Sequence, residues 1–82
     1  MEIAFTPAAW RVWQKLPQKT QTRLQAKLLF YARDPLRYAA KLTNSRIGQY
    51  RFRVGDYRIV FDLTESTIVV LAVGHRKGIY KG

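Results

Sequence analysis

The spacing of apolar residues changes its period midway along the chain. In the first half the apolar residues recur at helical spacing. Thr6-Pro7 favours a helix start, and four apolar residues at this spacing follow it: Ala9, Trp10, Trp13 and Leu16. Pro17 ends this helix, and Asp34-Pro35 stops a second one predicted over 18–33. The apolar stripe of the second helix consists of Leu24, Leu28, Leu29, Tyr31 and Ala32.

In the second half apolar and polar residues alternate, as they do in strands. Strands are predicted over 50–54, 57–63 and 68–73, in addition to a short first strand over 2–5. The intervening Gly55-Asp56 suits a two-residue hairpin turn, because glycine adopts positive φ at little cost. The run over 68–73 is apolar on both faces, which suits an internal strand. A polar connection over 36–45 has room for a helical turn.

The predicted order is therefore β-α-α-β-β-β. We expect an α+β fold in which two N-terminal helices pack on one face of a small, mostly antiparallel twisted sheet. With 82 residues and no repeat or linker, the chain is predicted to be a single domain over 1–82, near the lower size limit for one core.

Counting outward from Gly55-Asp56 predicts which hairpin residues share a face, with Val54 opposite Tyr57. One face is apolar and available to the helices, and it carries Tyr50, Phe52, Val54, Tyr57, Ile59 and Phe61. The other face carries Arg51, Arg53 and Arg58. Antiparallel pairing of the last strand then brings three further residues close to Arg58, namely His75, Arg76 and Tyr80.

Arginines opposed across a hairpin, as Arg53 and Arg58 would be, lose part of the roughly 0.2–1 kcal/mol that a favourable pair contributes. A bound phosphate would offset this cost, since guanidinium groups donate to it through two nitrogens. The same alternation is also compatible with a solvated outer face. Lys19, Arg23 and Lys27 recur every four residues on the second helix, and this spacing is also compatible with a solvated helix face. Trp10 and Trp13 are expected to pack against the core.

Charge narrows the class of partner. Fifteen Lys and Arg against five Asp and Glu give a net charge of +10 and a pI near 10.6, typical of proteins that bind nucleic acid, anionic membranes or acidic proteins. A hydrophobic content of 48% excludes a disordered basic tail. With no Cys and one His, we expect no disulfides, no metal and no cofactor. Without a signal pattern or a long apolar run, we expect a cytoplasmic protein with no membrane partner.

The string over 48–61, GQYRFRVGDYRIVF, resembles the RelE/ParE toxin superfamily of type II toxin–antitoxin systems. The ending over 73–80, VGHRKGIY, resembles the RelE branch in particular, and the Phe5–Ala9 opening, the Leu16-Pro17 break and the Asp34-Pro35 stop also match. The resemblance implies a toxin that enters the ribosomal 30S A site and cuts mRNA there without a metal. It also implies a cognate, acidic, RelB-like antitoxin.

The resemblance further implies residue roles. Arg51 and Arg53 correspond to a basic pair, Arg58 and Arg76 to a phosphate clamp, and Tyr80 to a residue that stacks on a base or transfers a proton. Family members often carry lysine in the basic pair, whereas arginine stays protonated. The general base is therefore His75, Tyr80, or no protein group at all if the ribosome orients the 2′-hydroxyl. Contacts to ribosomal RNA are expected from Lys19, Arg23, Lys27, Arg46, Lys77 and Lys81.

Two other functions are compatible with parts of this pattern. A ParE-like toxin that inhibits DNA gyrase would have the same fold, although that branch generally lacks the full set of catalytic residues. A non-enzymatic nucleic-acid binder would need only the charge, because phosphate contacts dominate non-specific affinity.

Overall fold

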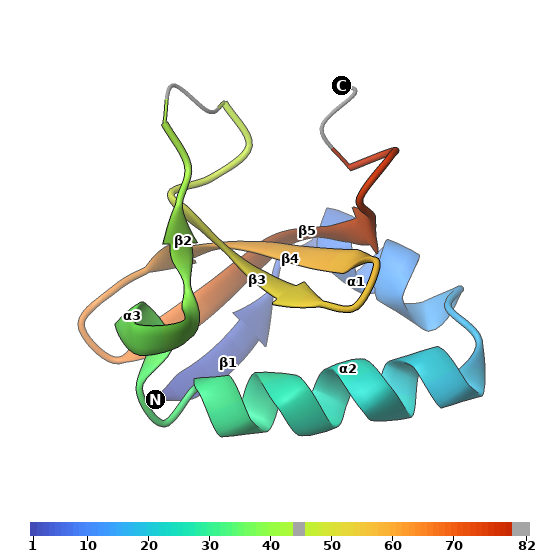
Figure 1. The fold of residues 1–82 in the computed structure, drawn as a ribbon, viewed down its shortest axis with the longest axis horizontal. Coiled ribbons are helices and arrows are strands. Elements are labelled where there is room, and N and C mark those ends of the chain that lie inside the picture. Colours follow the sequence, from blue (N-terminus) through green and yellow to red (C-terminus); the bar gives the residue numbers. More distant parts are fainter. Residues whose placement is uncertain (44–45, 80–82) are drawn as a thin grey trace.

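The computed structural model describes residues 1–43 and 46–79. The predicted Tyr80 and Lys81 sites lie outside this range. The elements are, in order, β1 Glu2–Phe5, α1 Pro7–Gln14, α2 Gln18–Tyr31, α3 Pro35–Tyr38, β2 Ala40–Lys41, β3 Tyr50–Val54, β4 Tyr57–Leu63 and β5 Thr67–His75 (Figure 1). None of the helices in the described ranges has the length and apolar character needed to cross a membrane.

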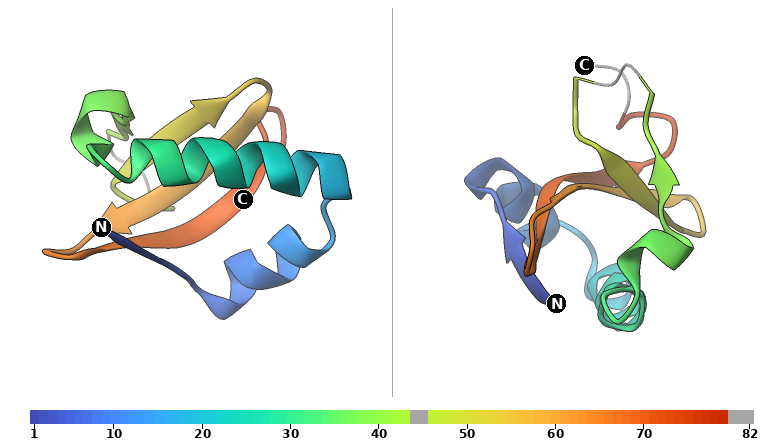
Figure 2. Two further views of the ribbon diagram at one scale, coloured as in Figure 1. Left: turned by 90° about the horizontal axis from the view of Figure 1, so that it is seen from below. Right: turned by 90° about the vertical axis from the view of Figure 1, so that its left-hand side faces the viewer.

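The strands form one sheet in the order β1-β5-β4-β3-β2. β1 runs parallel to β5, and every other neighbouring pair is antiparallel. Seen from below, α1 and α2 lie across the same face of this twisted sheet (Figure 2). The predicted α+β class, with two N-terminal helices on one face, is therefore confirmed.

The start of α1 follows local capping chemistry, while two of the predicted helix ends were wrong. Thr6 Oγ1 accepts a hydrogen bond of 3.2 Å from the Ala9 amide, which caps α1 as expected. α1 ends at Gln14 and α2 at Tyr31, each two residues early. Pro35, read only as a stop, also opens α3, because proline fits the first position of a helix.

The hairpin has the predicted register. Gly55 has a φ of 59°, and the pairs run from Val54↔Tyr57 through Arg53↔Arg58 to Tyr50↔Phe61. Two features were not predicted. β2, which pairs Ala40 with Arg51, is too short to show alternation, and β5 is longer than expected and has a bulge opposite Val60/Phe61.

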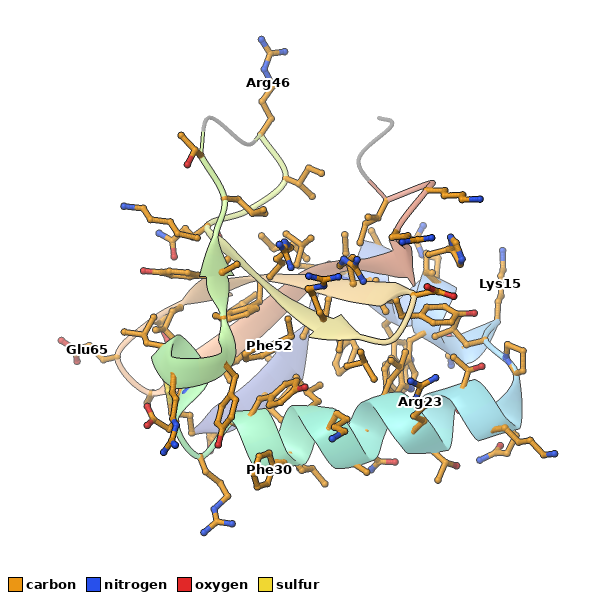
Figure 3. The ribbon with its side chains drawn as sticks, in the orientation of Figure 1. Lys15, Arg23, Phe30, Arg46, Phe52 and Glu65 are labelled. Carbon is orange, nitrogen blue, oxygen red and sulfur yellow. The ribbon has the colours of Figure 1, made fainter. Side chains whose placement is uncertain are left out.

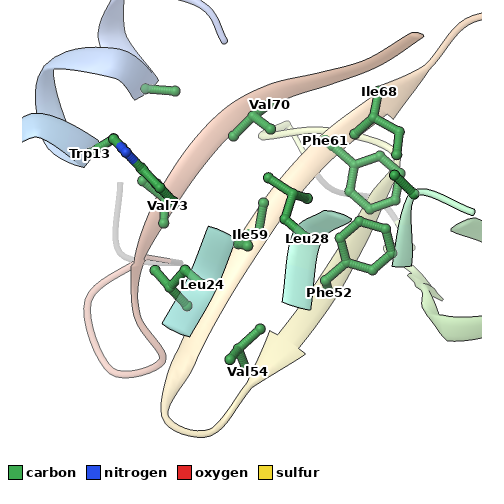
Figure 4. Close-up of a cluster of buried hydrophobic side chains, with 12 residues drawn as sticks. Trp13, Leu24, Leu28, Phe52, Val54, Ile59, Phe61, Ile68, Val70 and Val73 are labelled. Carbon is green, nitrogen blue, oxygen red and sulfur yellow. The ribbon is translucent and has the colours of Figure 1, made fainter. Parts of the chain in front are cut away.

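The core lies between the helices and the predicted apolar face of the hairpin (Figure 4). Phe52, Val54, Ile59 and Phe61 are buried there with Trp13, Leu24 and Leu28, while Tyr50 and Tyr57 are half-buried at its edge. Leu29 is 57% exposed and lies outside the stripe in which it was predicted. Trp10 is 46% exposed and packs edge-on against Phe5.

Candidate active site

Three arginines lie on the sheet face opposite the helices, because their positions alternate with the core residues of β3 and β4. They differ in depth. Arg53 is exposed, Arg51 is half-buried between β2 and β4, and Arg58 is only 7% exposed. We call Arg51, Arg53 and Arg58 the arginine face. Of its three guanidinium groups, that of Arg58 is buried and that of Arg53 is exposed to solvent.

Arg58 is fixed to the hairpin turn. Its Nη1 donates to the carbonyl oxygens of Gly55 and Tyr57, each at 3.0 Å. These bonds satisfy a largely buried charge and hold the turn closed at the same time. The Arg53–Arg58 opposition is therefore tolerated partly because the Arg58 guanidinium is directed toward carbonyl oxygens.

The segment after β5 is fixed to the other side of the same turn. The Arg76 amide donates to the Asp56 carbonyl at 2.7 Å, and Arg76 Nε lies 3.7 Å from Asp56 Oδ1. The chain then turns back, with the amides of Gly78 and Ile79 both donating to the His75 carbonyl. Arg58 and Arg76 thus converge on Gly55-Asp56 from two directions.

His75 is close to this site along the backbone, but its ring faces the other way. Gly74 is the partner of Arg58 in the sheet, and His75 is the partner of Tyr57, whose ring centroid is 6.0 Å from its own. Paired residues share a face, so the imidazole lies on the Tyr57 side. His75 Nδ1 accepts from the Lys77 amide at 3.2 Å, which leaves Nε2 as the protonated nitrogen of the neutral ring.

The predicted RNA-binding cations do not form one surface. Lys19, Arg23 and Lys27 are exposed on α2, while Arg46 projects away from the sheet at the opposite side of the molecule (Figure 3). Lys77 is exposed beside Arg76. The arginine of this α2 stripe contacts the turn: a Cβ added to Gly55 would lie 2.5 Å from Arg23 Nη2.

Two residues of this region were missed by sequence reasoning. The sequence pattern predicts only a turn role for Asp56, yet its carboxylate pairs with Arg76. Tyr31 is predicted as part of an apolar stripe, yet its hydroxyl also donates to the Arg53 carbonyl at 3.2 Å. The signal for Asp56 was available, since an acid in a hairpin turn of a strongly basic chain lies near whatever cations flank that turn.

The chemistry available here is stabilisation of negative charge. Arginine has five donors and no acceptor, so the arginine face and Arg76 can bind phosphate oxygens but cannot remove a proton. A transition state with excess charge on its non-bridging oxygens would be bound more tightly than its ground state.

The fold and these cations define a class of protein, a small basic α+β domain with four arginines on and beside one hairpin. Residues 3–80 match the family described as ParE toxin of type II toxin-antitoxin system, parDE, and the chain therefore belongs to this family of the RelE/ParE superfamily. The recognition made from the sequence is confirmed.

Individual relatives point to the RelE side of the superfamily. The chain is 33% identical over 86 residues to toxin RelG of Mycobacterium tuberculosis, covering 96% of this chain and 94% of RelG. The toxin–antitoxin complex RelBE2 of M. tuberculosis has a matching chain with a TM-score of 0.81 and 29% identity, covering 92% of this chain and 96% of that one. The isolated Escherichia coli RelE toxin, at 24% identity and a TM-score of 0.76 over 90% and 82% of the two chains, shares the fold.

Proposed function

We propose that this toxin is a ribosome-dependent endoribonuclease that cleaves mRNA in the A site and so inhibits translation. The observation that carries the proposal is the convergence of Arg58 and Arg76 on one hairpin turn, beside Arg51 and Arg53. Cations gathered from two strands and the segment after β5 suit a single phosphate better than a diffuse polyanion.

In the proposed reaction the ribose 2′-hydroxyl loses its proton, and its oxygen attacks the adjacent phosphorus. The P–O5′ bond breaks and O5′ gains a proton, leaving a 2′,3′-cyclic phosphate and a 5′-hydroxyl end. Arg58 and Arg76 hold the non-bridging oxygens, and Arg51 and Arg53 stabilise the added charge of the pentacoordinate state.

We propose three routes for removal of the 2′-proton: His75 as general base, Tyr80 as general base, or orientation of the 2′-hydroxyl by the ribosome without a protein base. In the structure the Lys77 amide uses the Nδ1 lone pair of His75, so His75 would serve as a base only after its ring turns. A His75→Ala variant that keeps the pH–rate profile of the wild type would eliminate this residue.

We further propose an acidic, RelB-like antitoxin as partner. A net charge of +10 favours such a partner, and solved relatives include the intact RelBE complex of E. coli. Affinity is expected to fall as salt rises, while apolar anchors keep a residual interaction. Equal affinity from low to molar salt would contradict this electrostatic argument.

The proposed activity is tested by primer extension on a translated mRNA, with and without ribosomes. We expect new cuts within codons only when ribosomes are present. Arg76→Ala should abolish these cuts, whereas Arg11→Ala, an exposed arginine on α1, removes the same charge and should leave them intact. Intact mRNA with continued translation would refute the proposal.

Gyrase inhibition is the second candidate, favoured by the ParE description of the matching family. A supercoiling assay separates the two, and we expect no inhibition. A non-enzymatic binder would instead lose RNA affinity equally and slightly in Arg76→Ala and Arg11→Ala, without any cleavage by the wild type.

A further inference from the structure

An aromatic series runs from the core to the surface at the corner between α2 and α3. Phe61 stacks on Phe52 with centroids 4.3 Å apart, and Phe52 lies 4.9 Å from Tyr31. Tyr31 stacks on Tyr38 at 5.0 Å, and Tyr38 lies 5.3 Å from Phe30. Burial decreases along the series, from Phe61 at 0% exposed to Tyr38 at 37% and Phe30 at 46%.

The series ends in a hollow of about 360 Å³, which we call the corner hollow. It is lined by Phe30, Arg33, Asp34, Arg37 and Tyr38. Phe30 meets its ring neighbours at interplanar angles of 61° and 52°, so neither ring is stacked on it. Figure 3 shows Phe30 on the side of α2 that faces away from the sheet. Since Phe30 is 46% exposed and lines the hollow, part of its ring can contact another flat group.

The corner hollow contains one carboxylate and two guanidinium groups. Asp34 lies between two arginines in sequence, yet within the described ranges its carboxylate forms neither a capping hydrogen bond nor an ion pair. The Arg37 guanidinium instead lies 5.7 Å from the Tyr38 ring centroid. The hollow therefore presents a ring face, an acceptor-only carboxylate and two guanidinium groups side by side.

We propose that the corner hollow binds an unpaired guanine of single-stranded RNA, with the base on Phe30, its N1–H and N2–H donating to Asp34, and its phosphate beside Arg33 or Arg37. Unstacked bases are recognised in this way, by an aromatic platform and by groups that read the Watson–Crick edge. Among the bases, guanine has two adjacent donors on that edge, which match the two oxygens of a carboxylate.

The charges favour RNA over an acidic protein segment as the occupant. Such a segment would be attracted by Arg33 and Arg37, but its carboxylates would be repelled by Asp34 and could not donate to it. The site is also separate from the arginine face, since it belongs to α2 and α3 on the other side of the hairpin. Its test consequently does not depend on cleavage.

The first experiment is an NMR titration with guanosine 5′-monophosphate, uridine 5′-monophosphate and inorganic phosphate. We expect the Phe30 and Tyr38 ring signals to shift most with the guanine nucleotide, less with the uracil nucleotide and least with phosphate. Equal shifts from the two nucleotides, or shifts from phosphate alone, would overturn the assignment.

The second experiment measures the affinity of single-stranded RNA that contains guanine, by fluorescence anisotropy at fixed salt. Phe30→Ala should weaken binding about tenfold, as expected when one stacking platform is lost. Phe30→Leu, which keeps apolar packing, should weaken it similarly. Leu36→Ala removes another exposed apolar side chain of the same corner that does not line the hollow, and should have no effect.

Asp34→Asn separates base reading from charge. It removes one of two acceptors and one negative charge, so the preference for guanine over uracil should fall at least threefold while affinity for uracil-only RNA holds or rises. Retained guanine preference, a Phe30→Ala variant equal to Leu36→Ala, or ring shifts caused by an acidic peptide but not by RNA would each refute the proposal. If the wild-type protein does not cleave mRNA but the RNA-binding results are as expected, only the nuclease function is refuted.

Discussion

Successive residues of β3 and β4 point to opposite faces of the hairpin, and the side chains on the two faces are held in different ways. On the helix side Phe52 and Phe61 are completely buried, and burial itself fixes their positions. On the arginine side, Arg58 is buried but bound to carbonyl oxygens, while Arg53 is exposed next to it. One face stabilises the domain, and the other keeps cations available because its neighbour supplies the stability. Substitutions on the helix side should therefore change mainly stability, whereas on the arginine side the exposed Arg53 should matter mainly for activity and the buried Arg58 for both.

The largest loss of stability is expected from Phe52→Ala. It removes a fully buried ring from the stack with Phe61 and should lower the free energy of unfolding by about 3–5 kcal/mol. For a chain of 82 residues, whose total stability at the typical value per residue is about 4–12 kcal/mol, this loss is a large share. Urea denaturation gives the value, with Arg53→Ala as the control from the opposite face. A loss below that of the control would refute the division between faces.

Arg58→Ala should affect both properties. Removing the charged donor leaves the carbonyl oxygens of Gly55 and Tyr57 without it, which should cost about 1.5–3 kcal/mol. Ribosome-dependent cleavage should be lost in the same variant. Denaturation and primer extension together provide the test, and a variant of normal stability would show that these bonds do not hold the turn.

Gly55→Ala should cost about 1–2 kcal/mol, because its φ of 59° disfavours a side chain. The added methyl group would also contact the Arg23 guanidinium. Since that group is the end of a flexible side chain, combining Gly55→Ala with Arg23→Ala should recover part of the loss. A double-mutant cycle measures this coupling, and strictly additive effects would contradict the contact.

The smallest effect is expected from Asp56→Asn. The Arg76–Asp56 pair is 3.7 Å long and both side chains are more than half exposed, so its removal should change stability by less than about 1 kcal/mol. The bond from the Arg76 amide to the residue 56 carbonyl does not need the carboxylate and should persist. Thermal denaturation at low and high salt tests this, and a large or salt-independent loss would show that the pair matters more than its exposure indicates.

The hairpin was predictable because its determinants are local. Gly55 fixes the turn, and a two-residue turn fixes every pair from Val54↔Tyr57 outward. The face on which His75 lies was not predictable, because it depends on the register between β4 and β5 and on a bulge opposite Val60/Phe61. A shift of one residue in such a pair exchanges the two faces.

Elements held by distant partners were also missed. β2 has only two residues and exists because Ala40 and Lys41 meet β3, and no pattern in so short a segment reveals a strand. The contact of Arg23 with Gly55 joins a helix to a turn more than one element away. Periodicity along the chain identifies what a face contains, but the partner of that face is set by tertiary packing.

The parallel pairing of β1 with β5 has a consequence for how the chain acquires its structure. Glu2 pairs with Thr67 and Phe5 with Val70, so β1 cannot pair until β5, which follows all the other described strands, has been made. Pairings so distant in sequence require loop closure before their contacts can form, which favours late formation. The helix-covered face cannot be sealed before β5 arrives, and the segment with His75 and Arg76 follows directly behind it. Gathering of Arg58 and Arg76 at the Gly55-Asp56 turn is thereby coupled to completion of the sheet, and a partly made chain lacks both.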